Sequence, residues 1–132
     1  MVDVTLIEDD EIFAEYIALV LQRAGYRVRP YSDLPNEQEI FATRTPQIIV
    51  SDIYLPSGNG VSLAMEMKER WPDIKVILIS TDTITLRSEE AQVADKILPK
   101  PFTAPELLQT VQLALLEPAS GSLSEYPNPR TD

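Results

Sequence analysis

The chain has 132 residues, of which 44% are hydrophobic and 24% charged, as expected for one globular domain with one core. With 21 acidic and 11 basic residues its net charge is -10, which argues against direct binding to the phosphates of nucleic acids. Cysteine and histidine are both absent, which excludes disulfides, thiolate or histidine metal sites, and Ser-His or Cys-His catalysis.

The composition also indicates where we expect the protein to act. No apolar run reaches the roughly 18 residues that a membrane-spanning helix needs, and the start lacks the basic and apolar segments of a secretory signal. We therefore expect a cytoplasmic protein with no membrane contact. Its acidity suits hard cations, which prefer oxygen ligands.

In chain order, the first half of the sequence alternates between strand and helix patterns. Residues 2–7 read as a short buried strand, and the spacing from residue 10 to 24 predicts a helix with Phe13, Ile17, Val20 and Ala24 on one stripe. Residues 26–31 alternate like a half-exposed strand, and residues 34–43 suit a short helix. Residues 47–52 predict a buried strand that ends on Asp52.

The second half repeats the alternation. After a loop over residues 53–60, Val61, Leu63, Ala64 and Met67 mark a helix, and residues 75–80 form a fourth predicted strand. Residues 84–93 suggest a weak helix, residues 96–98 a brief strand, and residues 104–116 a clear final helix. We expect one domain over residues 1–117, followed over residues 118–132 by a disordered tail or linker rich in Pro, Ser and Gly.

Five β-α units in succession predict a doubly wound α/β fold with a parallel five-stranded sheet, because parallel strands need crossover connections. In a sheet of order 2-1-3-4-5, ligands bind beyond the carboxyl ends of the strands. These ends carry Glu8 and Asp9, Asp52, Ser80, and finally Lys100. The order would bring three carboxylates, a hydroxyl and an ammonium to one crevice.

Three clustered carboxylates do not all stay ionised without a cation or raised pKa values. Magnesium takes oxygen ligands and keeps several waters, so it resolves this conflict. The acids of the run "LIEDDE" near the start of the chain are therefore predicted to hold Mg²⁺.

Four motifs carry a resemblance to a known family. They are "IEDD" after the first strand, "DIYLPSGNG" after the third, "ILIST" at the fourth and "LPKPF" after the fifth. Together, in this order, they make residues 2–117 resemble the CheY-like (flavodoxin-like) receiver domain of two-component response regulators.

The resemblance implies a role for each of these residues. Asp52 matches the aspartate that accepts a phosphoryl group from a histidine kinase or phosphotransfer protein. Glu8 and Asp9 match the acidic pair that holds Mg²⁺, with the backbone carbonyl of Tyr54 as a further ligand. The hydroxyl of Ser80 and the ammonium of Lys100 match the groups that contact the phosphoryl oxygens, and the Lys100-Pro101 bond is expected to be cis. The implied protein is a signalling module that assists its own Mg²⁺-dependent phosphorylation and dephosphorylation rather than an enzyme, and it controls a partner or an effector domain.

Some residues depart from the family pattern. Ser80 stands where threonine is usual, and Thr81 stands where a small residue is usual. Ile97 occupies the place of an aromatic residue that reports phosphorylation, and the segment between Ser80 and Lys100 is short. These departures affect the surface expected to signal to a partner or effector domain more than they affect the phosphorylation site.

Other interpretations remain open from the sequence. Glu8 and Asp9 could only complement the dipole of the following helix, as we expect of Asp10, which suits its N-cap. The whole chain could be a pseudo-receiver, an interaction module that works without phosphorylation. An aspartate-nucleophile phosphohydrolase is disfavoured, because its D-x-D-x-T motif is replaced here by "DIYLP".

Overall fold

The computed structural model describes residues 1–118, so the predicted tail lies, apart from Pro118, outside the described residues. In the part that is described, no helix is both long and apolar enough to cross a membrane.

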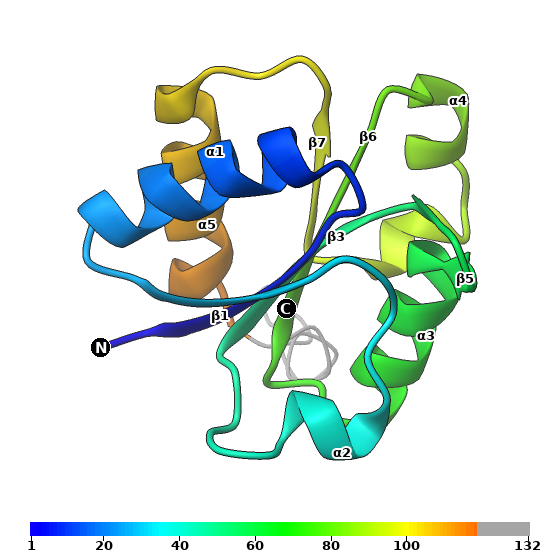
Figure 1. The fold of residues 1–132 in the computed structure, drawn as a ribbon. Helices are drawn as coiled ribbons and strands as arrows, with labels where there is room; N and C mark the ends of the chain where they lie inside the picture. The colour runs from blue at the N-terminus through cyan, green and yellow to red at the C-terminus, as the bar shows by residue number, and fades with distance from the viewer. Residues whose placement is uncertain (119–132) are drawn as a thin grey trace, which may run out of the picture.

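Five parallel strands form one twisted sheet in the order β2-β1-β3-β6-β7 (Figure 1). The strands are β1 (Asp3–Ile7), β2 (Arg27–Tyr31), β3 (Ile48–Asp52), β6 (Lys75–Ser80) and β7 (Lys96–Pro99). This order confirms the predicted 2-1-3-4-5 topology, since β6 and β7 are the fourth and fifth strands of the sheet.

Helices cover both faces of the sheet (Figure 1). On one face lie α1 (Glu11–Arg23) and α5 (Ala104–Leu116). On the other lie α2 (Glu37–Ile40), α3 (Gly60–Arg70), α4 (Thr83–Leu86) and a 3₁₀ turn, η1 (Ala91–Val93). The domain is therefore a three-layer sandwich, as the sequence predicts.

Each face of the sheet has its own hydrophobic core, because successive side chains of a strand point to opposite faces. Leu6 packs into the core under α1 and α5, whereas its neighbour Ile7 packs into the core under α2, α3 and α4. All residues of β3 and β6 are buried, as expected for central strands covered on both sides.

The first helix begins and packs nearly as predicted. The Asp10 side chain accepts a hydrogen bond from the Phe13 N–H at 3.1 Å, which confirms Asp10 as the N-cap. Ile17 is fully buried, but Leu21 rather than Ala24 completes the buried stripe. Ala24 is exposed because it is the C-cap, and Gly25 follows with a φ of +98°, a left-handed conformation that glycine adopts without strain.

Two helix predictions are wrong in extent. The helix expected over residues 34–43 is the single turn α2, which starts at a capping box made by Asn36 and Glu39. The helix expected over residues 84–93 is split into α4 and η1. Between them the Ser88 hydroxyl donates to the Thr85 carbonyl at 2.6 Å and accepts from the Ala91 N–H at 3.2 Å. This side chain offers the backbone an alternative to the helical hydrogen bonds.

The loop after β3 contains an antiparallel hairpin that the sequence analysis did not predict. It pairs β4 (Tyr54–Leu55) with β5 (Gly58–Asn59). The hairpin leads directly into α3, whose N-cap is Asn59.

A buried ion pair stabilises the end of the sheet where β6 begins. The Lys68 ammonium lies 2.9 Å from the Asp95 carboxylate and also donates to the carbonyls of Pro72 and Ile74. Both side chains are about 5% exposed or less. Asp95 in turn accepts the Val76 N–H at 2.8 Å, so the pair holds α3, β6 and the start of β7 together.

Candidate functional site

Three carboxylates meet at the carboxyl end of the sheet. Ligand oxygens of Glu8, Asp9 and Asp52 all lie within 4.8 Å of one another. Glu8 and Asp52 are buried, whereas Asp9 is exposed. The structure thus brings together all three acids that the sequence analysis selected.

Strand pairing explains how Glu8 and Asp52 come to lie side by side. β1 and β3 are parallel neighbours, and Ile7 of β1 pairs with Ser51 of β3. The residues that follow this pair, Glu8 and Asp52, therefore lie at the same edge of the sheet. Gly60 then packs against the backbone behind Asp52: a Cβ atom added there would lie 2.2 Å from the Asp52 carbonyl oxygen. Only glycine permits this close approach, which sets the path of the loop after β3.

Lys100 joins two of the acids. Its ammonium lies 2.9 Å from Glu8 Oε1 and 3.0 Å from Asp52 Oδ2, and 4.8 Å from the centre of the Phe13 ring. The Lys100-Pro101 peptide bond is cis, as the sequence analysis predicted. The Lys100 N–H also donates to the Ser80 carbonyl at 2.9 Å, which fixes the backbone from which the side chain projects.

The protonation of this cluster reflects its burial and its charges. Burial raises the pKa of Glu8, and the hydrogen bonds from Lys100 and from the Asp10 N–H only partly oppose that rise. Burial alone would lower the pKa of Lys100, but its hydrogen bonds to Glu8 and Asp52 outweigh burial and raise that pKa. The Lys100 ammonium is therefore firmly charged, whereas the charged form of Glu8 is disfavoured chiefly by its burial.

Ser80, the predicted hydroxyl, ends β6 and is buried. Its Oγ accepts a hydrogen bond from the Asp82 N–H at 3.0 Å. Because Asp82 is the N-cap of α4, the hydroxyl is connected to the start of that helix through one backbone group. Ser80 thus lies at the carboxyl end of β6, one residue beyond Ile79, which pairs with Asp52 of β3.

A second polar group at the rim was not predicted. The Asp82 carboxylate accepts hydrogen bonds from the hydroxyls of Thr85 and Tyr54, both at 2.6 Å. These bonds, with that of the Thr85 hydroxyl the largest, lower the pKa of Asp82 to about 2. The Asp82-x-x-Thr85 spacing is typical of a helix N-cap and could have predicted the contact with Thr85. The contact with Tyr54 joins two separate loops, so no local pattern predicts it.

The residues that depart from the family pattern are placed as follows. Thr81 is exposed directly after Ser80, and Ile97 is half buried against the core under α3. Within the short segment before Lys100, α4 has a single turn of four residues.

The donor set of the cluster fits a divalent hard cation. Glu8, Asp9, Asp52 and Lys100 together carry one positive and three negative formal charges, so a net charge of about -2 remains when all are ionised. Within residues 1–118 Asp9 forms no ion pair, which leaves its carboxylate available. Carboxylate oxygens are the ligands that Mg²⁺ prefers.

Comparison with known proteins identifies the family of the chain. Residues 4–112 match the family model described as the response regulator receiver domain. The chain is 30% identical over 122 residues to the KDP operon transcriptional regulatory protein KdpE of Escherichia coli, covering 87% of this chain and 52% of KdpE. It is 26% identical over 115 residues to the response regulator receiver protein CpdR of Brucella abortus, covering 86% of this chain and 96% of CpdR.

A solved structure shows the same fold. The response regulator TrrA of Thermotoga maritima, in complex with Mg²⁺-BeF, superposes with a TM-score of 0.79 at 23% identity, covering 87% of this chain and all of TrrA. Several curated relatives are longer than this chain, which spans about half of KdpE and 20–26% of other matched regulators.

Proposed function

The chain belongs to the receiver domain family of two-component response regulators, and we propose that Asp52 accepts a phosphoryl group from the phosphohistidine of a sensor kinase or phosphotransfer protein. One observation carries the proposal: the carboxyl end of the sheet joins Asp52 to two further carboxylates and to Lys100. Like charges this close together are unfavourable for stability alone, which favours a functional role for the three acids.

Glu8, Asp9 and Asp52 would hold Mg²⁺, with the backbone carbonyl of Tyr54 as a further ligand. The similar fold of TrrA, which was solved in complex with Mg²⁺-BeF, supports this assignment. When bound, the metal supplies positive charge to the phosphoryl oxygens during transfer. Asp9 is exposed, so it can reach the metal from the solvent side.

In the transfer step, a carboxylate oxygen of Asp52 forms a bond to phosphorus while the bond between phosphorus and the donor nitrogen breaks. The electron pair of the broken bond stays on the donor imidazole. Asp52 Oδ1 accepts a hydrogen bond from the Ile53 N–H at 2.8 Å, and Oδ2 accepts one from the Lys100 ammonium. These two bonds hold the carboxylate in a fixed orientation. The Lys100 ammonium would then exchange its contact with the Asp52 carboxylate for a contact with the negatively charged phosphoryl oxygens. The same arrangement would assist hydrolysis of the acyl phosphate by water.

The phosphoryl group would change the loop after β6. Its oxygens would accept a hydrogen bond from the Ser80 O–H and so draw the side chain towards Asp52, while Ser80 Oγ accepts a hydrogen bond from the Asp82 N–H. Movement of Ser80 would therefore release or shift Asp82, and with it the start of α4 and the Tyr54 side chain. This path supplies a switch although Ile97 replaces the usual aromatic residue.

The output of the switch is a changed affinity for a partner or for an effector domain. The family is a signalling family rather than a class of enzymes, and the greater length of KdpE supports the idea that this domain acts together with further protein. We place the protein in the cytoplasm, where two-component phosphotransfer takes place.

Isothermal titration with MgCl₂ at neutral pH tests the metal assignment. The substitution Asp9→Asn should weaken Mg²⁺ binding at least about tenfold, since it removes one of three anionic ligands. The matched control is Asp10→Asn, which keeps an N-cap and lies one residue outside the cluster. Equal Mg²⁺ affinity in Asp9→Asn and the parent would contradict the assignment.

A further inference from the structure

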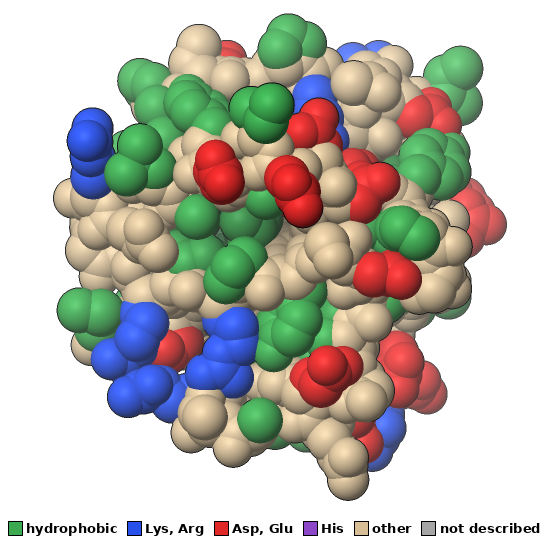
Figure 2. All heavy atoms as spheres, in the orientation of Figure 1, with side chains coloured by type: hydrophobic (Ala, Val, Ile, Leu, Met, Phe, Trp, Pro, Cys, Tyr) green, Lys and Arg blue, Asp and Glu red, His purple; other side chains and the backbone are tan. Residues whose placement is uncertain are grey.

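Three arginines line a small hollow at the opposite end of the sheet from Asp52. The hollow has a volume of about 80 Å³ and is lined by Arg27, Arg29 and Arg44, together with Asp3, Thr5 and Ile40. Figure 2 shows the largest group of basic side chains on this face of the molecule at the lower left, while acidic side chains are spread over the remainder. In a chain with a net charge of -10, such a concentration of positive charge calls for an explanation.

The fold explains how the hollow forms. In the β1–β2 pairing Arg27 lies opposite Asp3 and Arg29 opposite Thr5, so these side chains share one face of the sheet. The helix over that face, α2, has only one turn, and residues 41–47 after it form neither helix nor strand. Arg44 comes from this connection and also lines the hollow.

The charges of the hollow do not cancel. The Arg27 guanidinium lies 2.6 Å from the Asp3 carboxylate, which neutralises one of the three arginines. Arg29 donates to the Thr43 hydroxyl, a neutral partner. Within residues 1–118 neither Arg29 nor Arg44 forms an ion pair, so two guanidinium charges remain for a ligand.

We propose that this hollow binds the phosphate group of a small phosphorylated molecule. Guanidinium groups present planar pairs of N–H donors that match phosphate oxygens, and the hollow is lined by Arg29 from β2 and by Arg44 from the connection after α2. At about 80 Å³ the hollow is well below the roughly 300–1,000 Å³ of pockets that enclose whole drug-sized ligands, which suits a phosphate group rather than a nucleoside. The acidic surface around it repels nucleic acids and other long polyanions, which favours a small anion.

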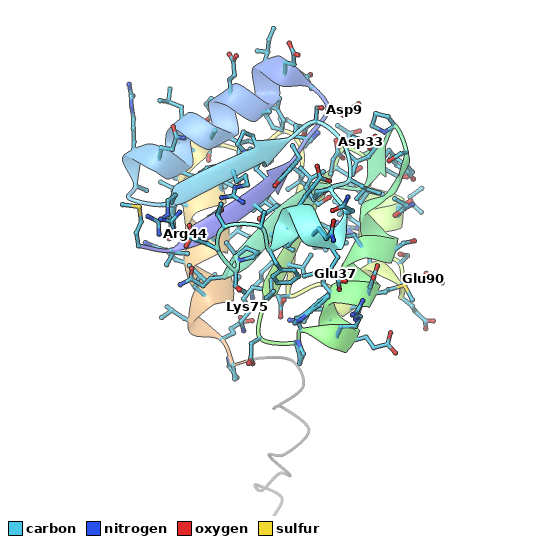
Figure 3. All side chains as sticks on the ribbon, turned by 60° about the horizontal axis from the view of Figure 1, so that its bottom comes forward. Asp9, Asp33, Glu37, Arg44, Lys75 and Glu90 are labelled. Atoms are coloured by element: carbon cyan, nitrogen blue, oxygen red, sulfur yellow. The ribbon has the colours of Figure 1, made fainter. Side chains whose placement is uncertain are left out.

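The hollow is separate from the site proposed for phosphorylation. Asp3 and Arg27 begin β1 and β2, whereas Glu8 and Asp52 stand at the ends of β1 and β3. Figure 3 shows this separation, with Arg44 near the start of β1 and Asp9 beyond its end. Ligand binding here therefore requires neither Mg²⁺ nor an intact Asp52.

Titration of the ¹⁵N-labelled protein with inorganic pyrophosphate, followed by NMR without Mg²⁺, tests the proposal. We expect saturable shifts of the amide signals of residues 27–29 and 43–45. The double variant Arg29→Gln/Arg44→Gln should weaken binding at least about tenfold, because it removes both uncompensated guanidinium groups. The single variant Arg44→Gln, at an exposed side chain, gives the same test if the double variant does not fold.

Two control variants and one control ligand, citrate, make the outcome decisive. Arg87→Gln removes one positive charge from an exposed position in the segment after α4, and it should leave the affinity unchanged. Asp52→Asn should also bind pyrophosphate like the parent, which keeps this test apart from that of the phosphorylation site. Non-saturable shifts, equal affinity in the arginine variants, or equal binding of citrate in place of pyrophosphate would overturn the phosphate assignment.

Discussion

Replacing Lys100 by methionine tests whether Lys100 neutralises the acidic cluster. The ammonium lies 2.9 Å from Glu8 and 3.0 Å from Asp52, and the exposed fractions of these three side chains are 16%, 1% and 11%. Breaking a fully buried ion pair by removing one partner costs about 3–5 kcal/mol, because the other charge stays unpaired. Allowing for the residual exposure of Lys100 and Asp52, we expect the free energy of unfolding of Lys100→Met to fall by about 2–4 kcal/mol in the absence of divalent cations.

Magnesium should recover much of this loss. A divalent cation between the carboxylates can replace the charge of the missing ammonium. A ligand whose free concentration is a hundred times its Kd adds about 2.7 kcal/mol to the stability of the folded state. Urea denaturation in EDTA and in saturating MgCl₂ measures both quantities. The stabilisation by Mg²⁺ should be larger in Lys100→Met than in the parent.

A matched control separates this effect from the loss of any lysine. Lys96 forms an ion pair with Glu117 at a more exposed position, and Lys96→Met should cost less than about 1 kcal/mol. A loss in Lys100→Met no larger than in Lys96→Met, or the same response to Mg²⁺ in variant and parent, would refute the electrostatic reasoning.

Three further predictions concern the surroundings of the site. Gly60→Ala should destabilise the fold by about 1–3 kcal/mol in urea denaturation, because its Cβ would lie 2.2 Å from the Asp52 carbonyl oxygen and the backbone there must shift. Asp95→Leu should cost about 3 kcal/mol or more in the same assay, since it leaves the buried lysine of α3 without its carboxylate. In Tyr54→Phe the pKa of Asp82, followed by NMR of the carboxyl carbon, should rise from about 2 towards 3.8, because one hydroxyl donor is lost. The Asp82 carboxylate therefore contributes its full stabilisation above pH 3.8 and loses it as the pH falls towards about 2.

Each of these predictions has a result that would contradict it. An unchanged urea midpoint in Gly60→Ala would contradict the first prediction. An unchanged pKa of Asp82 in Tyr54→Phe would contradict the third. For Asp95→Leu the comparison is Glu37→Ala, which breaks an ion pair with Arg70 whose two side chains are about half exposed. An equal loss in both variants would show that burial of the pair adds nothing to its effect on stability.

The sheet and the clustering of the three carboxylates could be predicted from the sequence, because both depend on regular strand patterns and on the topology of a parallel sheet. Buried strands of five to six residues give a clear pattern, and parallel strands bring their carboxyl ends to one edge. Glu8 directly follows β1, Asp52 ends β3 and Lys100 directly follows the shorter strand β7, so the topology alone brings them together. The roles assigned to them remain predictions that rest on the family resemblance.

The rest of the site depends on contacts that no local pattern contains. The strands β4 and β5 have two residues each, too few for a period to be recognised. The hydrogen bond from Tyr54 to Asp82 joins residues 28 positions apart, and it exists only because the loops after β3 and β6 lie side by side. The break between α4 and η1 comes from one serine side chain whose hydrogen bonds compete with those of the helix.

Intact mass after incubation with acetyl phosphate, with and without Mg²⁺, is the most direct test of phosphorylation at Asp52. We expect one phosphoryl adduct that requires Mg²⁺ and is absent in Asp52→Asn. Asp33→Asn changes a half-buried aspartate whose carboxylate accepts hydrogen bonds from Ser57 in the β4–β5 turn; it serves as the control and should still form the adduct. A folded parent protein that gains no adduct, or an adduct that persists in Asp52→Asn, would contradict the assignment of Asp52 as the phosphoryl acceptor.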